Sequence, residues 1–171
     1  MDQPNFYELR KLNSSTEHRG GLKFALYARV STDEQNNEQQ IDRLVSYAER
    51  KGYQYEVFEE KESTRKTRPV KQQVLSKLRG FELDGVIIWK LDRWARSSTE
   101  LVTEIEELTN KGLLFVSLSD NIDLSSPSGR LQFQILAAFA EFERNLISER
   151  TKEGLKRAVK NGRKLGRPRK R

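Results

Sequence analysis

The chain has 171 residues, of which 35% are hydrophobic and 33% are charged. This length and composition predict one folded domain with appended segments. No apolar run approaches the roughly 18 residues of a membrane span, and no secretory signal is visible, so we expect a cytoplasmic protein. Cysteine is absent and the single histidine is His18, which excludes disulfide scaffolds, thiol nucleophiles, zinc fingers and multi-histidine metal sites.

The net charge of +7 is located at the C-terminus. Residues 160–171 contain seven basic side chains and no acidic one, whereas the rest of the chain has 25 of each sign. Such a segment predicts a polyanionic partner, most commonly nucleic acid. Residues 166–169 read Gly-Arg-Pro-Arg, an extended pattern whose arginines suit the negative potential of a narrow minor groove. We expect double-stranded DNA to contact Arg163, Lys164, Arg167, Arg169 and Lys170.

Apolar runs and helical repeats alternate between residues 22 and 125. Buried strands are predicted at 24–30, 55–58, 85–89 and 113–118. Helices are predicted at 31–51, 69–80 and 97–111, where a capping hydroxyl or a proline opens each repeat. Residues 59–68 are expected to form a loop, and residues 1–21 a poorly ordered extension. This order predicts an α/β fold with a mostly parallel sheet covered by helices.

A long helix is predicted after the sheet domain. It starts at residues 125–128 and meets no proline from Gly129 to about Lys160, which gives a length of about 45 Å. The part from Leu131 to Leu146 is apolar on more than one face. One face can cover the sheet domain, and the others predict contact with a second copy of the helix. The second half is charged and is expected to project toward the basic tail.

Polar residues follow the predicted strands, at the edge where parallel sheets collect their chemistry. Ser31 follows Arg29 by two residues, so the two side chains are predicted to share one side of the strand. Arg93 and Arg96 are three apart after Asp92, a spacing predicted to place both arginines on one face of a helical turn. A serine among arginines suits a phosphodiester, because guanidinium groups bind phosphate oxygens and stabilise charge at phosphorus. Asp92 is a candidate proton donor or acceptor for the leaving oxygen.

Each of these residues also has a structural interpretation. A serine after a strand is more often a helix cap than a nucleophile. Neighbouring arginine and aspartate side chains are more often surface ion pairs, and Tyr27 can simply be part of the core. Glu104, Glu106 and Glu107 are expected to form a solvated helix face, and no metal site is predicted.

Several motifs together resemble the serine recombinases, the resolvase/invertase family. The first motif is Tyr27-Ala28-Arg29-Val30-Ser31-Thr32 and the fullest is Lys90-Leu91-Asp92-Arg93-Trp94-Ala95-Arg96. The remaining matches are Gln35, Gln40, Lys61, Ser63, Arg68, residues 140–144, 149–151 and 153–154, and the Gly-Arg tail. The resemblance spans residues 23–168 and keeps the family's order and spacing.

The resemblance implies a mechanism. Ser31 attacks a DNA phosphate and forms a 5′-phosphoserine linkage, and four subunits exchange strands without metal or ATP. It implies that Arg29, Arg68, Arg93 and Arg96 activate the scissile phosphate and that Asp92 assists proton transfer or holds the arginines. Tyr27, Gln35 and Gln40 would support the site, and Arg144 would join it or the DNA from the long helix. No cofactor is implied, and the partners are DNA and further copies of the chain, as a homodimer and a synaptic tetramer.

The resemblance also divides the chain. Residues 22–125 would form the catalytic domain, 126–160 the oligomerisation helix and 161–171 a DNA-binding arm, with no helix-turn-helix after Arg171. We therefore expect weak, salt-sensitive DNA binding at the nucleoid. Ser63-Thr64 and Ala95 stand where many relatives have Ser-Gly and Gly. Two alternatives remain: a dimeric DNA-binding regulator without catalysis, and a metal-dependent nuclease.

Overall fold

The computed structural model of the chain describes residues 21–30, 34–61 and 67–163, apart from the side chains of residues 34–36. One five-stranded sheet has the order β2-β1-β3-β4-β5. Its strands are β1 (Lys23–Val30), β2 (Gln54–Lys61), β3 (Gly85–Ile88), β4 (Leu114–Ser117) and β5 (Ile122–Asp123). The first four are parallel, and β5 pairs antiparallel with β4. The predicted mostly parallel α/β sheet is confirmed.

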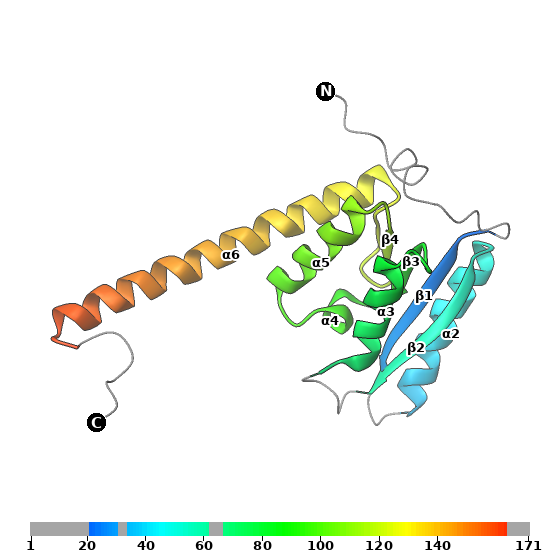
Figure 1. Ribbon diagram of the computed structural model, residues 1–171, viewed down its shortest axis with the longest axis horizontal. Helices are drawn as coiled ribbons and strands as arrows, with labels where there is room; N and C mark the ends of the chain where they lie inside the picture. Colours follow the sequence, from blue (N-terminus) through cyan, green and yellow to red (C-terminus); the bar gives the residue numbers. More distant parts are fainter. Residues whose placement is uncertain (1–20, 31–33, 62–66, 164–171) are drawn as a thin grey trace.

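Helices cover both faces of the sheet (Figure 1). They are α2 (Glu34–Arg50), α3 (Pro69–Arg79), the single turn α4 (Leu91–Trp94), α5 (Ser98–Asn110) and α6 (Pro127–Lys160). On one face, Leu44 and Ala48 of α2 pack on Phe24, Leu26 and Ile87. On the other face, side chains of α3, α4 and α5 pack on alternate strand residues, among them Tyr27, Val86 and Phe115. Alternation along each strand thus supplies two apolar layers, as the continuous apolar runs predicted.

The structure corrects the sequence prediction of secondary structure at three places. β2 continues through Glu59, Glu60 and Lys61, which were expected to be loop, because Glu60 is buried and the segment pairs with the end of β1. β5 was missed because it has two residues. The helical turn expected to join Arg93 and Arg96 ends at Trp94, and Ala95 is extended with φ −122° and ψ 160°.

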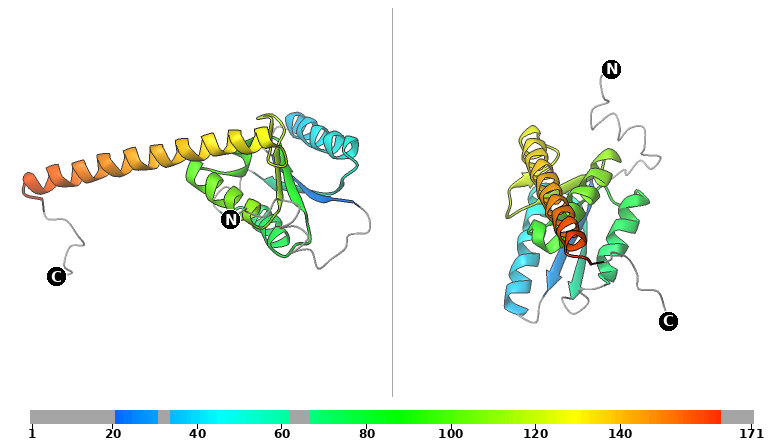
Figure 2. Two further views of the ribbon diagram at one scale, coloured as in Figure 1. Left: turned by 90° about the horizontal axis from the view of Figure 1, so that it is seen from above. Right: turned by 90° about the vertical axis from the view of Figure 1, so that its left-hand side faces the viewer.

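Helix α6 starts against the sheet domain and then leaves it (Figure 2). Its 34 residues correspond to about 51 Å. Gly129 is required at its start, because a Cβ there would lie 2.0 Å from the Asp123 carbonyl oxygen. Phe133 and Ala140 are buried, whereas most other large apolar side chains of the helix are exposed: Leu131, Ile135, Leu136, Phe139, Phe142, Ile147, Leu155 and Val159. None of the described helices is long and apolar enough to cross a membrane.

Candidate active site

A polar hollow lies where β1 and β3 end, with a volume of about 370 Å³. Among the described residues, its lining contains four cationic side chains, three amides and one tryptophan, and no carboxylate. These residues are Arg29, Arg43, Lys90, Arg93, Asn37, Gln39, Gln40 and Trp89. We call this site the cationic hollow. Its charge and hydrogen-bond donors suit a phosphate group.

Three elements build the cationic hollow. Arg29 is the penultimate residue of β1, and Lys90 and Arg93 follow the end of β3. Gln40 and Arg43 come from α2, where a spacing of three residues places side chains on one face. The parallel arrangement of β1 and β3 therefore brings together side chains that are far apart in the sequence, as predicted for Arg29 and Arg93.

Arg43 was not predicted as a site residue. Its guanidinium carbon lies 4.8 Å from the centroid of the Trp89 ring, so a cation–π contact holds it at the wall of the cationic hollow. Lys90 belongs to the motif at residues 90–96 but was not predicted to line the site. The signal that was available for Arg43 is its spacing of three residues from Gln40 on the same helix, α2.

Arg68 does not line the cationic hollow within the described part of the chain. Its side chain is buried, where Nη1 donates a hydrogen bond to the Trp94 carbonyl oxygen at 2.7 Å and Nη2 donates to the Arg93 carbonyl oxygen. Its φ of 46° is unusual for a residue with a side chain, and the following Pro69 disfavours the ordinary helical conformation there. Arg68 therefore fixes the backbone that carries Arg93.

Tyr27 belongs both to the core and to the site. Its side chain is fully buried, its ring packs edge-on against Trp94 at 5.3 Å, and its hydroxyl accepts a hydrogen bond from Arg68 Nη2 at 3.4 Å. Burial raises the pKa of Tyr27, against the lowering effect of Arg68. The hydroxyl is thus held neutral beside Arg68.

Asp92 and Arg96 lie outside the lining that is described for the cationic hollow. Asp92 is on the surface, with a side chain that is 64% exposed and an oxygen 3.7 Å from Arg93 Nε. This geometry matches the surface ion pair that was weighed as its structural interpretation. The Arg96 side chain is exposed, and its backbone N–H donates to Glu100 Oε2 at 2.8 Å.

Several predicted residues fall outside the site or outside the described ranges. Ser31 and four of the tail residues, Lys164, Arg167, Arg169 and Lys170, lie outside the described residues. Arg144 is exposed on α6 and lines a separate groove between α5 and α6. Arg163 is exposed directly after α6. Glu104, expected on a solvated face, is instead half-buried 2.8 Å from Lys71 Nζ, so that expectation was wrong.

The fold and the cationic hollow define a class: a parallel α/β domain with arginines gathered at its strand ends, suited to phosphodiester chemistry. Residues 24–164 match the family model "Resolvase, N terminal domain". The chain therefore belongs to the resolvase and invertase family of serine recombinases, enzymes that cut and rejoin DNA.

Individual relatives agree with this membership. The Tn917 transposon resolvase of Enterococcus faecalis is 43% identical over 142 residues, which cover 83% of this chain and 74% of that protein. A DNA-invertase of Escherichia phage P1 is 46% identical over 143 residues, which cover 82% of this chain and 73% of that protein. The crystal structure of the N-terminal catalytic domain of TP901-1 integrase is 36% identical with a TM-score of 0.65, covering 72% of this chain and 98% of that one.

Proposed function

We propose that this recombinase cleaves DNA through Ser31. The serine Oγ attacks the scissile phosphorus and becomes bonded to the 5′-phosphate, and the 3′-oxygen leaves with a proton as a free hydroxyl. The phosphoserine bond retains the energy of the phosphodiester, so religation requires neither ATP nor metal. The observation that carries this proposal is the cationic hollow, because Arg29 lies in its lining two residues before Ser31.

In this proposal the cationic hollow holds the scissile phosphate. Arg29 and Arg93 bind its oxygens and stabilise the charge that develops at phosphorus, while Gln40 orients it. Arg43 and Lys90 add two cations at the wall, suited to the same phosphate or to its neighbour. Arg68 and Tyr27 support the site from the protein interior, Arg96 contacts the scissile phosphate, and Asp92 assists proton transfer or holds Arg93.

We also propose a division of labour along the chain. Residues 22–125 carry the chemistry, 126–160 form the oligomerisation helix, and 161–171, which include Arg163, enter the minor groove of double-stranded DNA, with Arg144 as a further DNA contact. The exposed apolar side chains of α6, with Phe139 and Phe142 6.4 Å apart between ring centroids, support a homodimer and a synaptic tetramer built through this helix.

A covalent trap tests the chemistry. The protein is mixed with supercoiled plasmid DNA in EDTA, quenched with SDS and digested, and the peptides are searched for a nucleotide adduct by mass spectrometry. An adduct on Ser31 that Ser31→Ala lacks supports the proposal. Cleavage that EDTA abolishes would indicate a metal-dependent nuclease, and DNA binding that Ser31→Ala leaves unchanged, without any adduct, would indicate a regulator.

A further inference from the structure

The backbone between α4 and α5 is held by two side chains that do not themselves line the described part of the cationic hollow. Arg68 donates to the carbonyl oxygens of Arg93 and Trp94. Glu100 accepts the backbone N–H of Arg96 on Oε2 at 2.8 Å. Residues 93–96 thus have their backbone orientation fixed at both ends, and this segment carries two of the arginines proposed to contact DNA.

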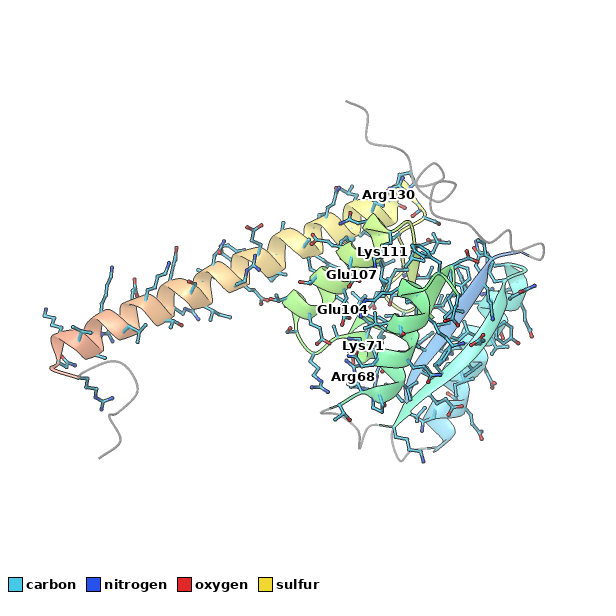
Figure 3. The ribbon with its side chains drawn as sticks, viewed as in Figure 1. Arg68, Lys71, Glu104, Glu107, Lys111 and Arg130 are labelled. Atoms are coloured by element: carbon cyan, nitrogen blue, oxygen red, sulfur yellow. The ribbon has the colours of Figure 1, made fainter. Side chains whose placement is uncertain are left out.

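The other carboxylate oxygen of Glu100 is held by buried cations. Oε1 lies 2.7 Å from Lys71 Nζ and 3.8 Å from Arg68 Nη1. Lys71 is 1% exposed, and its ammonium also lies 2.8 Å from Glu104 Oε2 and 5.0 Å from the centroid of the Trp94 ring. Figure 3 shows Arg68 and Lys71 near the start of α3, with Glu104 of α5 beside them.

This arrangement leaves Glu100 little freedom. A buried ammonium that loses its carboxylates is strongly unfavourable, so Lys71 keeps Glu100 and Glu104 in place. Burial alone would raise the pKa of Glu100, but Lys71 and the Arg96 N–H lower it below its usual value. Glu100 therefore stays ionised while it joins α3, α5 and the segment that carries Arg96.

We infer that Glu100 is a positioning residue for strand cleavage, that it acts through Arg96, and that Lys71 holds it in place. The inference rests on the proposed function, because Arg96 must contact the DNA for its placement to matter. The alternative is a purely structural role as part of the α5 cap, where Ser97 Oγ accepts the Glu100 N–H at 3.1 Å. If the role of Glu100 were purely structural, its substitution would slow cleavage only by lowering the stability of the fold.

A double-mutant cycle separates the two roles. The single-turnover rate of Ser31 adduct formation on supercoiled plasmid DNA is measured for Glu100→Ala, alone and in the Arg96→Ala background. Positioning through Arg96 predicts that Glu100→Ala alone slows adduct formation by about tenfold or more. In the Arg96→Ala background, the same substitution should change the rate by no more than about twofold. DNA affinity should stay unchanged in both cases. The matched control is Glu106→Ala, an exposed glutamate of the same helix, which is expected to keep the wild-type rate. Equal losses in both backgrounds would overturn the inference.

If Glu100→Ala folds poorly, Glu100→Gln provides a second way to distinguish positioning from a purely structural role. The amide keeps an acceptor oxygen for the Arg96 N–H but removes the charge opposite Lys71. Positioning predicts that cleavage recovers toward the wild-type rate although the variant unfolds at lower urea concentration. A rate that falls in step with stability across Glu100→Gln and Glu100→Ala would overturn the inference.

Amide hydrogen exchange tests the positioning contact independently of the proposed function, because it is measured without DNA. Without DNA, Glu100→Ala is expected to accelerate amide exchange in residues 93–97, and Glu106→Ala is not. A wild-type protein that never forms the Ser31 adduct would refute the proposed function, and exchange would still report on the positioning contact. Unchanged exchange in Glu100→Ala would overturn the inference even where the adduct forms.

Discussion

Arg68 Nη1 donates a hydrogen bond to the Trp94 carbonyl oxygen at 2.7 Å, although the two residues are 26 positions apart. The same guanidinium donates to Arg93 O and to the Tyr27 hydroxyl. A planar group with several fixed donors can satisfy these acceptors together, whereas an ammonium cannot reproduce that geometry. One buried arginine thus joins β1, α3 and the segment after β3, which carries Arg93 of the cationic hollow.

Arg68→Lys is therefore expected to destabilise the fold and to slow cleavage. At least one buried carbonyl loses its donor, which costs about 2 kcal/mol of unfolding free energy. Urea denaturation measures the change, and the covalent trap measures the rate. Arg130→Lys is the matched control, because Arg130 is exposed and donates to Ser125 O at 3.4 Å. Wild-type stability in Arg68→Lys would contradict the structural role given to its guanidinium.

The sequence predicted the four parallel strands and the four longer helices, because apolar runs and capping residues are local signals. It also predicted that Arg29 and Arg93 belong to one site, since both lie at carboxyl ends of parallel strands. The burial of the Arg68 side chain could not be predicted in this way, because it depends on carbonyl acceptors that are 25 and 26 residues away in the sequence. The burial of Lys71 was missed for the same reason: its carboxylate partners belong to α5.

Arg43→Ala is expected to weaken DNA binding without unfolding the protein. Arg43 is exposed, so the change costs the cation–π contact with Trp89, about 0.5–1 kcal/mol. Loss of one phosphate contact should lower the slope of log Kd against log salt by about 1. Fluorescence anisotropy on duplex DNA over a salt series measures this slope. Arg50→Ala changes an exposed arginine of α2 that does not line the described part of the cationic hollow, and should keep the wild-type slope.

The stability of the chain should fall in acid partly through Glu107. Arg79 donates to both of its oxygens at 2.8 Å, and this pairing lowers the pKa of Glu107 to about 2. Because the folded-state pKa lies below the unfolded value of about 4.3, the contribution is complete above that pH and is lost as pH falls toward 2. The pair is partly exposed, so we expect less than about 1 kcal/mol.

Urea midpoints of the wild type and Glu107→Gln, measured between pH 7 and pH 2.5, check this expectation. The difference should be largest at neutral pH and should shrink toward the acid end. Glu106→Gln is the control, because Glu106 is exposed on the same helix and makes no ion pair among the described residues. A gap between wild type and Glu107→Gln that stays constant over this range would contradict the assigned pKa.

Phe139→Glu is expected to dissociate the proposed dimer while leaving the subunit folded. Phe139 is 62% exposed in the single chain, so a charge there meets water in the monomer but apolar side chains in a helix–helix contact. The dimer Kd should rise by about 100-fold or more, as for the loss of a central aromatic anchor. Sedimentation velocity over a concentration series measures the shift.

Val159→Glu is the matched control, because Val159 is 55% exposed on α6 beyond the predicted contact at 131–146. The same oligomeric state for Phe139→Glu and the wild type would contradict dimerisation through this face, and equal dissociation by Val159→Glu would place the contact elsewhere on the helix.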